Sequence, residues 1–380
     1  MAASGIDNEL VEGVRRFVKK RIAPYTATWN RDGQAPDSVL AEMGGMGLFG
    51  LLLPEEYGGA GCNLSTFIAV VEELAAGDGG LSTLVHVHGL GTAMLLARLG
   101  SEAQKRAWLA KMASGEVIGA VCLTEPSAGS DLSAITGRAT RTEGGWLLNA
   151  NKQFISNGAR AGLVIVLAVT DPQAGSRGKS FFLVPKGTRG FTPGKLERKM
   201  GQHTSDTAQM HFENCFVPDD MVLGAVGEAL PLTMGLLSDG RISVASQAVG
   251  MARAAYELAL GYSRERTAFG KSIFDHQAVG FRLADMHAAI DMARVYTRHA
   301  AQLFDEGQEC AREASIAKLV SAEMAEKVCS DAIQIHGGNG YINDYRVEQI
   351  FRDVRVCQIY EGTNDIQRLI IARRIREQQL

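Results

Sequence analysis

The sequence has no closely spaced cysteine pair and no long uninterrupted apolar run. Its six cysteines stand at positions 62, 122, 215, 310, 329 and 357, with no two closer than 19 residues. This spacing matches no zinc motif and no Cys-x-x-Cys redox pair, so we expect no metal site and a reduced, intracellular compartment. No apolar run approaches the roughly 18 residues that a membrane-spanning helix needs, so we also expect no membrane segment.

The sequence also has no large excess of positive or negative charge. The 39 lysines and arginines and the 42 aspartates and glutamates leave a net charge of −3, which provides no basic surface for nucleic acid or for an anionic membrane. The N-terminus, Met1 to Ile22, mixes acidic with basic residues and has no apolar core, unlike a secretory signal or a transit peptide. These features predict a cytoplasmic protein, or a mitochondrial-matrix protein if the source is eukaryotic.

Proline is scarce, with nine residues, whereas glycine is abundant, with 43 of 380. Glycine therefore makes up about 11% of the chain, against about 7% in an average protein. The hydrophobic fraction of 46% is ordinary for a folded protein, and the length fits two or three domains of about 150 residues each. We expect the glycines at turns and where the backbone approaches a cofactor.

The spacing of apolar residues changes twice along the chain. The first third has helical spacing, interrupted by glycine-rich turns. Val164–Val169, Phe181–Val184 and the alternating Thr207–Phe212 are then typical of strands, and after Gly227 the helical spacing returns. This order predicts a mainly α protein with a central β domain. The predicted domains are an N-terminal helical domain at 1–117, a middle β domain at 118–226 and a C-terminal helical domain at 227–380.

Some short motifs are better explained by structure than by chemistry. Gly45-x-Gly47-x-x-Gly50 has the glycine spacing of a dinucleotide-binding loop. A helix rather than a strand precedes it, so we interpret it as a helix end followed by a turn. His86 and His88 have no metal-ligating cluster near them in sequence, which favours a structural or substrate-pocket role. The chain also lacks the Gly-x-Ser-x-Gly elbow of many hydrolases.

Three segments differ from the surrounding scaffold. Val121–Asp131 combines hydroxyl groups with small residues at the change from helix to strand, where backbone amides can hold a polar ring or phosphate. Gln334–Tyr341 interrupts the helical pattern with three glycines that allow close approach of a ligand. Gln358–Asp365 is a polar island between apolar helical stretches. Each glycine loop is equally compatible with a plain tight turn, and Glu361 alone would more often be a solvated or paired carboxylate than a base.

Taken together, the segments resemble the signatures of the acyl-CoA dehydrogenase family, in its short- and medium-chain-like form. The resemblance covers nearly the whole chain, and five pieces occur in order with family-like separations. They are Cys122–Ala134, Phe154–Gly158, Arg264–Lys271 with His276 and Gln277, Gln334–Asp353, and Tyr360–Thr363. Five pieces in order are far more specific than any one of them.

The resemblance implies a three-part fold and a flavin enzyme. The implied fold has an N-terminal helical domain, a middle β-barrel or sandwich domain and a C-terminal four-helix bundle. The implied enzyme is an oxidoreductase of fatty acid metabolism that binds FAD non-covalently and forms a homotetramer. Its substrate would be an acyl-CoA, and an electron-transferring flavoprotein would accept the electrons.

The resemblance also assigns roles to individual residues. Glu361 is at the position of the general base, and its backbone N–H would help to hold the thioester oxygen. The implied FAD contacts within one chain are Val121, Cys122, Leu123, Thr124, Gly129, Ser130, Phe154, Ile155, Ser156, Thr363, Asn364 and Asp365. The implied contacts to the FAD of a neighbouring subunit are Arg266, Phe269, Gln277, Gln334, Ile335, His336, Gly337 and Gly338. The implied substrate contacts are Ser130, Ser238, Asp239, Gly240, Arg241 and Gly362.

The sequence departs from the family pattern at several of these positions. Phe154 stands where Trp is frequent, Gln349 where a basic residue is usual, and Ser238 where Asp is common. Gly240 occupies the place of an alternative base in isovaleryl- and long-chain-type members. Glu361 is therefore the one base in register.

The implied reaction is removal of the α proton by Glu361 and transfer of a β hydride to FAD, which gives a trans-2-enoyl-CoA. Because a free glutamate has a pKa of about 4.3, we expect burial by substrate to raise the pKa of Glu361 toward about 6–7. Leu81 replaces the Arg with which glutaryl-CoA members hold a distal carboxylate, which disfavours glutaryl-CoA. The acyl length would depend on residues near Leu84–Leu90 and on loops of the β domain.

Related enzymes with this fold leave other functions open. Elimination of sulfinate from an acyl-CoA and flavin monooxygenation are the alternatives, and nitroalkane oxidases use an Asp base. Glu361 favours dehydrogenation over each of them without excluding elimination. A catalytically silent acyl-CoA- or flavoprotein-binding protein is less compatible with an intact Glu361.

Overall fold

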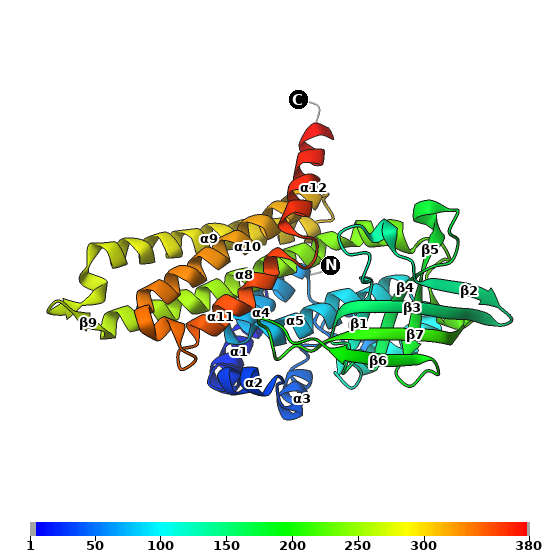
Figure 1. Cartoon of the computed structure of the whole chain (residues 1–380), viewed down its shortest axis with the longest axis horizontal. Coiled ribbons are helices and arrows are strands. Elements are labelled where there is room, and N and C mark those ends of the chain that lie inside the picture. Colours follow the sequence, from blue (N-terminus) through cyan, green and yellow to red (C-terminus); the bar gives the residue numbers. More distant parts are fainter. Residues whose placement is uncertain (1–4, 378–380) are drawn as a thin grey trace.

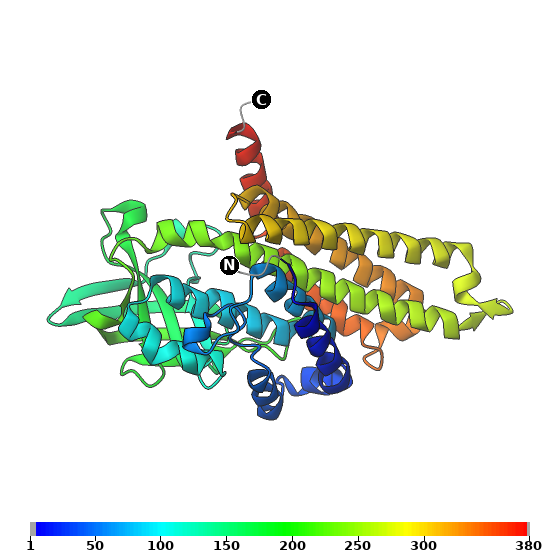
Figure 2. The same ribbon diagram turned by 180° about the vertical axis from the view of Figure 1, so that it is seen from behind.

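A computed structural model of the chain describes residues 5–377, with the backbone alone for residues 231–237. A helical N-terminal part, a central sheet and a long C-terminal helical bundle follow one another along the chain (Figure 1). The sheet lies at one end of the molecule, and the bundle extends to the other end (Figures 1 and 2). The mainly α fold with a central β region, as predicted from the sequence, is confirmed.

Helices make up the first third of the chain. Their bounds are α1 Asn8–Phe17, η1 Val18–Ile22, α2 Thr26–Asp32, α3 Asp37–Gly45, η2 Glu55–Tyr57, α4 Leu64–Gly77, α5 Gly79–His86, η3 Val87–Ala93, α6 Met94–Leu99 and α7 Glu102–Ala113. Ser101 starts α7 through a capping box with Gln104. The helix α3 ends at Gly45, and Gly47 follows with a φ of +74°, which confirms the interpretation of this glycine motif as a helix end and a turn.

One helical stretch, Gly79–Leu99, is longer than the sequence pattern indicates, since helical spacing is evident there only from Gly91. It consists of α5, the π-helical segment η3 and α6. By length and composition it is apolar enough to cross a membrane, although no single apolar run fills it. However, 78% of its most apolar window is buried inside the protein, as in a core helix.

The middle of the chain forms an eight-stranded sheet. Its strands are β1 Gly119–Cys122, β2 Arg138–Thr142, β3 Gly145–Ser156, β4 Leu163–Val169, β5 Lys179–Pro185, β6 Phe191–Leu196, β7 Thr207–Pro218 and β8 Val222–Leu223. The strand order is β6-β7-β3-β2-β4-β5-β8, and β1 pairs in parallel with β4. Val164 of β4 packs in one apolar core with Trp146. The adjacent Leu163 packs in a second core with Leu95 of α6, so the apolar run of β4 reflects burial on both faces.

The last third of the chain is a bundle of long helices with a hairpin at its tip. The bounds are α8 Ala229–Glu265, β9 Thr267–Ala268, β10 Lys271–Ser272, η7 Ile273–Asp275, α9 Gln277–Asp305, α10 Ala311–His336, η8 Gly337–Tyr341, α11 Val347–Val354, η9 Arg355–Gln358 and α12 Asn364–Glu377. Its core is rich in fully buried alanines such as Ala252, Ala325 and Ala332, which let helices pack closely. The β9–β10 hairpin lies at the end of the bundle that is farthest from the sheet (Figure 1).

Candidate active site

Glu361 lies in the short connection between η9 and α12, and its backbone has a φ of +55°. A non-glycine residue in this left-handed region is strained and needs support from its surroundings. The support comes from Gln367, whose side-chain amide donates to the carbonyl oxygens of Glu361 at 3.1 Å and Gly362 at 2.8 Å. The strained segment is therefore held in one conformation from the first turn of the following helix.

Lys318 of α10 also holds the segment around Glu361 in place. Its Nζ donates to the carbonyl oxygen of Gly362 and to the Oδ1 of Asn364, both at 2.9 Å. The side chain is fully buried, and this burial lowers its pKa to about 8. The sequence analysis did not name Lys318. The available signal was a lysine next to Ala317 and four residues after Ala314, on the apolar face of a long amphipathic helix.

Groups from two other helices surround the Glu361 carboxylate. The Nε2 of His86, at the end of α5, lies 3.5 Å from its Oε1. On the α8 side, a Cβ added at Gly240 would lie 2.9 Å from Oε2 and 3.3 Å from Cδ, so a glycine is needed for the carboxylate to occupy this place. The structure thus brings the two predicted site residues Glu361 and Gly240 together and adds His86, whose role the sequence left open.

These surroundings favour the ionised form of Glu361. Burial acts to raise the pKa of the carboxyl, but the interaction with His86 and the charges of Arg241 and Lys318 outweigh it. The net effect places the pKa of Glu361 below its usual value. A carboxylate that is ionised and half-buried, at 29% exposure, is in the state that can accept a proton.

The segment Ser238–Arg241, predicted to contact substrate, forms one turn of α8. Ser238 is half-buried, whereas Asp239 is buried and pairs with Arg98 at 3.0 Å. Burial raises the pKa of Asp239, and Arg98 opposes this effect. Arg241 is also buried, and its Nε has no hydrogen-bond partner among the described residues, which marks a place where polar contacts remain to be made.

The predicted flavin loop, Val121–Ser130, begins in β1 and is anchored by a buried ion pair. Lys152 of β3 lies 2.8 Å from Glu125 and also donates to the carbonyl oxygen of Leu123 at 3.0 Å. The Glu125 carboxylate further accepts the backbone N–H of Thr136 at 2.8 Å. The sequence placed Glu125 in the loop without finding its partner. Among the predicted contacts, Cys122 is fully buried and Val121, Leu123 and Thr124 are half-buried, whereas Gly129 and Ser130 are exposed.

Phe154 stands at a bulge in β3, where the pairing with β7 shifts between Lys152 and Ile155. Its φ is +59° and its side chain is 60% exposed, while Ile155 beside it is buried and Ser156 is half-buried. A bulge of this kind turns a side chain out of the sheet. The exposed aromatic face and the nearby hydroxyl groups of Thr124 and Ser156 have the chemistry to accept a planar polar ring such as a flavin.

The predicted contacts to a neighbouring subunit's FAD lie elsewhere in the fold. Phe269 is 96% exposed with a φ of +52° at the tip of the β9–β10 hairpin, and Arg266 and Gln277 flank this hairpin. The figures place the hairpin at the end of the bundle that is farthest from the sheet (Figures 1 and 2). A single chain therefore does not bring this hairpin to Phe154 and the flavin loop.

The segment Gln334–Gly338 ends α10 and begins η8. Gln334, Gly337 and Gly338 are exposed, whereas Ile335 and His336 are buried. His336 stacks on Tyr262 of α8 with a ring distance of 4.4 Å, and its Nδ1 lies 2.8 Å from the carbonyl oxygen of Ala332. Burial lowers the pKa of His336. Its side chain is thus committed to packing, and the exposed backbone around Gly337, with a φ of +59°, is the part that can reach a ligand.

A buried hydrogen-bond network connects the segment around Glu361 to the rest of the protein. The hydroxyl of Tyr360 donates to the Oε1 of Gln247 at 2.7 Å, and the amide of Gln247 donates to Thr83 at 3.2 Å. Thr83 in turn donates to Gln202 at 2.7 Å, and Gln202 donates to the carbonyl oxygen of Asp353 at 3.1 Å. Sequence reasoning did not predict this network, because its members are far apart in the chain.

Gln349, a departure from the family pattern, is buried beside this network. Its amide donates to Thr26 at 3.2 Å and lies 3.4 Å from the Asp353 carboxylate. Burial and the charge of Asp78 raise the pKa of Asp353 to about 6. A neutral amide at position 349 therefore satisfies hydrogen bonds in the interior without adding a charge.

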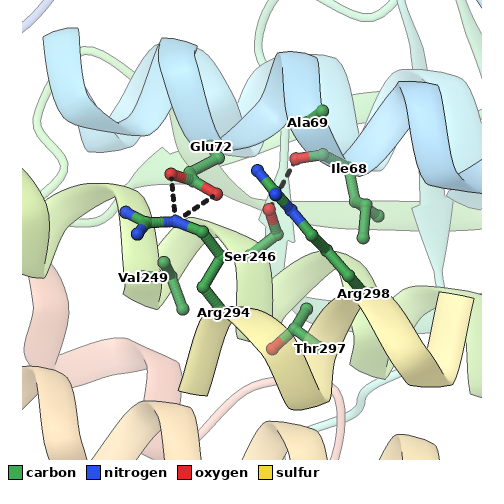
Figure 3. A pocket seen from close by; sticks show the side chains of 8 residues that line it. All are labelled: Ile68, Ala69, Glu72, Ser246, Val249, Arg294, Thr297 and Arg298. Atoms are coloured by element: carbon green, nitrogen blue, oxygen red, sulfur yellow. Dashed lines mark hydrogen bonds and ion pairs between the residues drawn. The ribbon is translucent and has the colours of Figure 1, made fainter. Parts of the chain in front are cut away.

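A narrow crevice with no room for a water molecule lies between α4, α8 and α9 (Figure 3). Glu72 accepts hydrogen bonds from the Nε of Arg294 at 3.0 and 3.3 Å, and Ser246 donates to the carbonyl oxygen of Ile68 at 2.5 Å. These polar groups satisfy one another across the three helices, as Figure 3 shows. We therefore interpret this crevice as part of the packing of the helices.

Comparison with known proteins agrees with this architecture. Models of the N-terminal, middle and C-terminal domains of acyl-CoA dehydrogenases match residues 7–116, 120–215 and 228–376. The chain is 42% identical over 361 residues to an acyl-CoA dehydrogenase of Bacillus subtilis, with 95% of each chain covered. It is 38% identical over 363 residues to the human mitochondrial short-chain specific acyl-CoA dehydrogenase, covering 96% of this chain and 88% of the relative.

A solved structure shows the same similarity in three dimensions. Butyryl-CoA dehydrogenase from Megasphaera elsdenii superimposes with a TM-score of 0.95 at 36% identity, with 99% of this chain and 100% of the other covered. Matching domain models, full-length relatives and a common fold lead to one conclusion. The chain belongs to the acyl-CoA dehydrogenase family and is an oxidoreductase.

Proposed function

We propose that the protein dehydrogenates a short-chain acyl-CoA at the α and β carbons, with Glu361 as the base and FAD as the cofactor. The observation that carries this proposal is the Glu361 carboxylate, which is half-buried, lies 3.5 Å from His86 and packs directly against Gly240. Its surroundings lower its pKa and so favour the ionised form. No second carboxylate stands at position 240 to share the role. The product is a trans-2-enoyl-CoA.

The chain's own residues supply the base and its orientation. His86, Arg241 and Lys318 keep the carboxyl of Glu361 deprotonated before substrate arrives. An acyl chain that covers the carboxylate removes water from it and acts to raise its pKa, which makes it a stronger base at the moment of proton transfer. FAD, when bound, supplies the acceptor for the β hydride.

The proposed FAD site combines residues of two subunits. The flavin loop, Phe154 and Ser156 provide one part, together with Thr363, Asn364 and Asp365 that follow Glu361. The exposed Phe269 and the exposed backbone at Gly337 provide the other, from a second copy of the chain. The distance between the two parts in one chain supports this sharing (Figure 1), and we propose the homotetramer that the family resemblance implies.

We infer a short acyl chain from the relatives, since the human protein is named short-chain specific and the Megasphaera protein is a butyryl-CoA dehydrogenase. The fully buried Leu81 and Leu84 of α5 offer no charged group for a distal carboxylate, which supports a plain alkyl chain. An electron-transferring flavoprotein is the proposed electron acceptor.

Anaerobic titration of the purified flavoprotein with saturated acyl-CoAs of increasing length tests this function. We expect butyryl-CoA to bleach the oxidised-flavin absorption band most rapidly, and longer or branched chains to act more slowly. Bound flavin that no saturated acyl-CoA reduces would contradict dehydrogenation. Release of sulfinate or consumption of oxygen with such a protein would indicate elimination or monooxygenation instead.

A further inference from the structure

His86 is placed at an irregular point in the helical stretch Gly79–Leu99. It is the last residue of α5, and the π-helical segment η3 begins at Val87. Segments of π-helix inside α-helices are frequent at functional sites. His86 is 3% exposed, so its imidazole meets protein groups rather than water.

Two partners face the two ring nitrogens of His86. Its Nδ1 lies 2.9 Å from the Oγ of Ser243 on α8, and its Nε2 lies 3.5 Å from the Oε1 of Glu361. An ionised carboxylate only accepts hydrogen bonds, so a neutral imidazole must carry its proton on Nε2. Its Nδ1 then accepts from the Ser243 hydroxyl, which assigns the tautomer and forms an ordered chain from Ser243 through His86 to Glu361.

The neighbouring His88 has a different role. Its Nδ1 accepts the backbone N–H of Gly119 at 3.0 Å, and its Nε2 donates to the carbonyl oxygen of Met112 at 3.0 Å. Burial lowers the pKa of His88 to about 4, so it stays neutral and joins the helix to the start of β1. His88 is thus part of the scaffold, and His86 is the histidine of the pair that reaches the reacting region.

The other charged groups around Glu361 act from farther away. Arg241 and Lys318 influence its carboxylate through their charge, and the carboxylate of Asp239 on α8 is paired with Arg98. Among the described residues, His86 is the one basic side chain with a nitrogen within 4.0 Å of the Glu361 carboxylate oxygens. It lies 3.5 Å from Oε1, whereas Oε2 is the oxygen that packs against Gly240.

We propose that His86, oriented by Ser243, is a positioning residue for the catalytic base. It holds Oε1 of Glu361, directs Oε2 toward the place of the substrate α carbon, and keeps the carboxylate ionised. This inference rests on the proposed function, in which Glu361 takes the α proton. It makes no claim that His86 itself exchanges a proton with substrate.

The test is the pH dependence of flavin reduction in single turnover, with saturating butyryl-CoA and no oxygen. We expect His86→Leu to reduce flavin about tenfold more slowly near neutral pH, and the acid limb of its pH profile to move to higher pH. His86→Gln, which keeps an N–H donor at a similar reach, should recover part of the rate. Ser243→Ala, which frees the imidazole from its anchor, should give a smaller loss in the same direction.

A matched control separates these effects from a general response to losing a histidine. His287 on α9 is exposed and lies 3.5 Å from Asp291, the same separation as in the His86–Glu361 pair. His287→Leu should leave the pH profile unchanged. Unchanged flavin content and melting temperature in the His86 variants would exclude a merely structural loss.

Two outcomes would overturn the inference. One is a His86→Leu enzyme whose rate and acid limb equal those of the wild type. The other applies if His86→Leu does not fold. In that case, pH profiles of flavin reduction in His86→Gln and Ser243→Ala that both coincide with the wild-type profile would overturn the inference. Failure of the proposed function would be distinct, because wild-type flavin would then not be reduced by any saturated acyl-CoA.

Discussion

The carboxylate of Glu361 fills the place that a side chain at Gly240 would need, since a Cβ at position 240 would lie 2.9 Å from the Oε2 of Glu361. This distance is shorter than any ordinary carbon–oxygen contact. The glycine of α8 and the carboxylate beyond η9 are 121 positions apart, yet each sets the place of the other. The absence of a side chain at position 240 is therefore part of the catalytic geometry that we propose.

Gly240→Ala should displace the carboxylate and slow flavin reduction by about 100-fold, because small misplacements of a reacting group have effects of this size. Affinity for acyl-CoA should change less than the reduction rate. Gly261→Ala is the matched control, since an added Cβ at this position of the same helix meets no atom within 4 Å. Equal reduction rates in the two alanine variants would show that the space at position 240 is not needed.

Lys318 should make stability depend on pH in the alkaline range. The folded chain lowers the pKa of Lys318 from 10.5 to about 8, so the stability that it contributes is fully present above about pH 10.5. This contribution is lost as the pH falls through about 8, and the difference is on the order of 3 kcal/mol. The free energy of unfolding, measured by urea denaturation at several alkaline pH values, checks this expectation.

Lys318→Met is the variant that isolates this effect. It removes the pH-dependent contribution to stability and also the hydrogen bonds to Gly362 and Asn364. Loss of these hydrogen bonds should lower the free energy of unfolding by about 1–3 kcal/mol. The wild type should therefore be the more stable protein near pH 10, and its advantage should shrink below pH 8. An advantage of the same size at both pH values would show that Lys318 does not change its ionisation on folding.

Sequence reasoning reaches a residue whose role depends on its own segment. Glu361 became the candidate base because Tyr360–Thr363 resembles a family segment, and the apolar run Val164–Val169 predicted the strand that the structure shows as β4. Sequence reasoning stopped where the role depends on a distant contact. The lysine at position 318 has its partners 44 and 46 positions away, and nothing local indicates them.

The roles of His86 and His88 also depend on contacts that are distant in the sequence. A His-x-His pair has no metal-binding cluster near it in sequence, which excluded one role without choosing another. The structure separates the two side chains, since His88 joins Gly119 and Met112 while His86 faces Glu361 and Ser243. The π-helical segment η3 begins at Val87, between the two histidines, and the sequence pattern did not indicate it.

The shared FAD site can be tested by complementation between two damaged chains. Phe154→Ala and Arg266→Ala alter the two parts of the proposed site, and each should lower flavin retention when expressed alone. Mixed oligomers contain sites in which both parts are intact, because the intact Phe154 of one chain meets the intact Arg266 of the other. Flavin content per chain, measured by absorbance after co-expression, should therefore recover. If the mixture retains no more flavin than the separate variants, the site is not shared.

The most direct test of the account is single-turnover flavin reduction in Glu361→Gln. Glutamine keeps the size of the side chain but cannot take up the α proton, so we expect reduction by butyryl-CoA to slow by at least about 1,000-fold. Flavin content and acyl-CoA binding should remain near those of the wild type. Rapid reduction in this variant would contradict the assignment of Glu361 as the base, and with it the mechanism proposed for this protein.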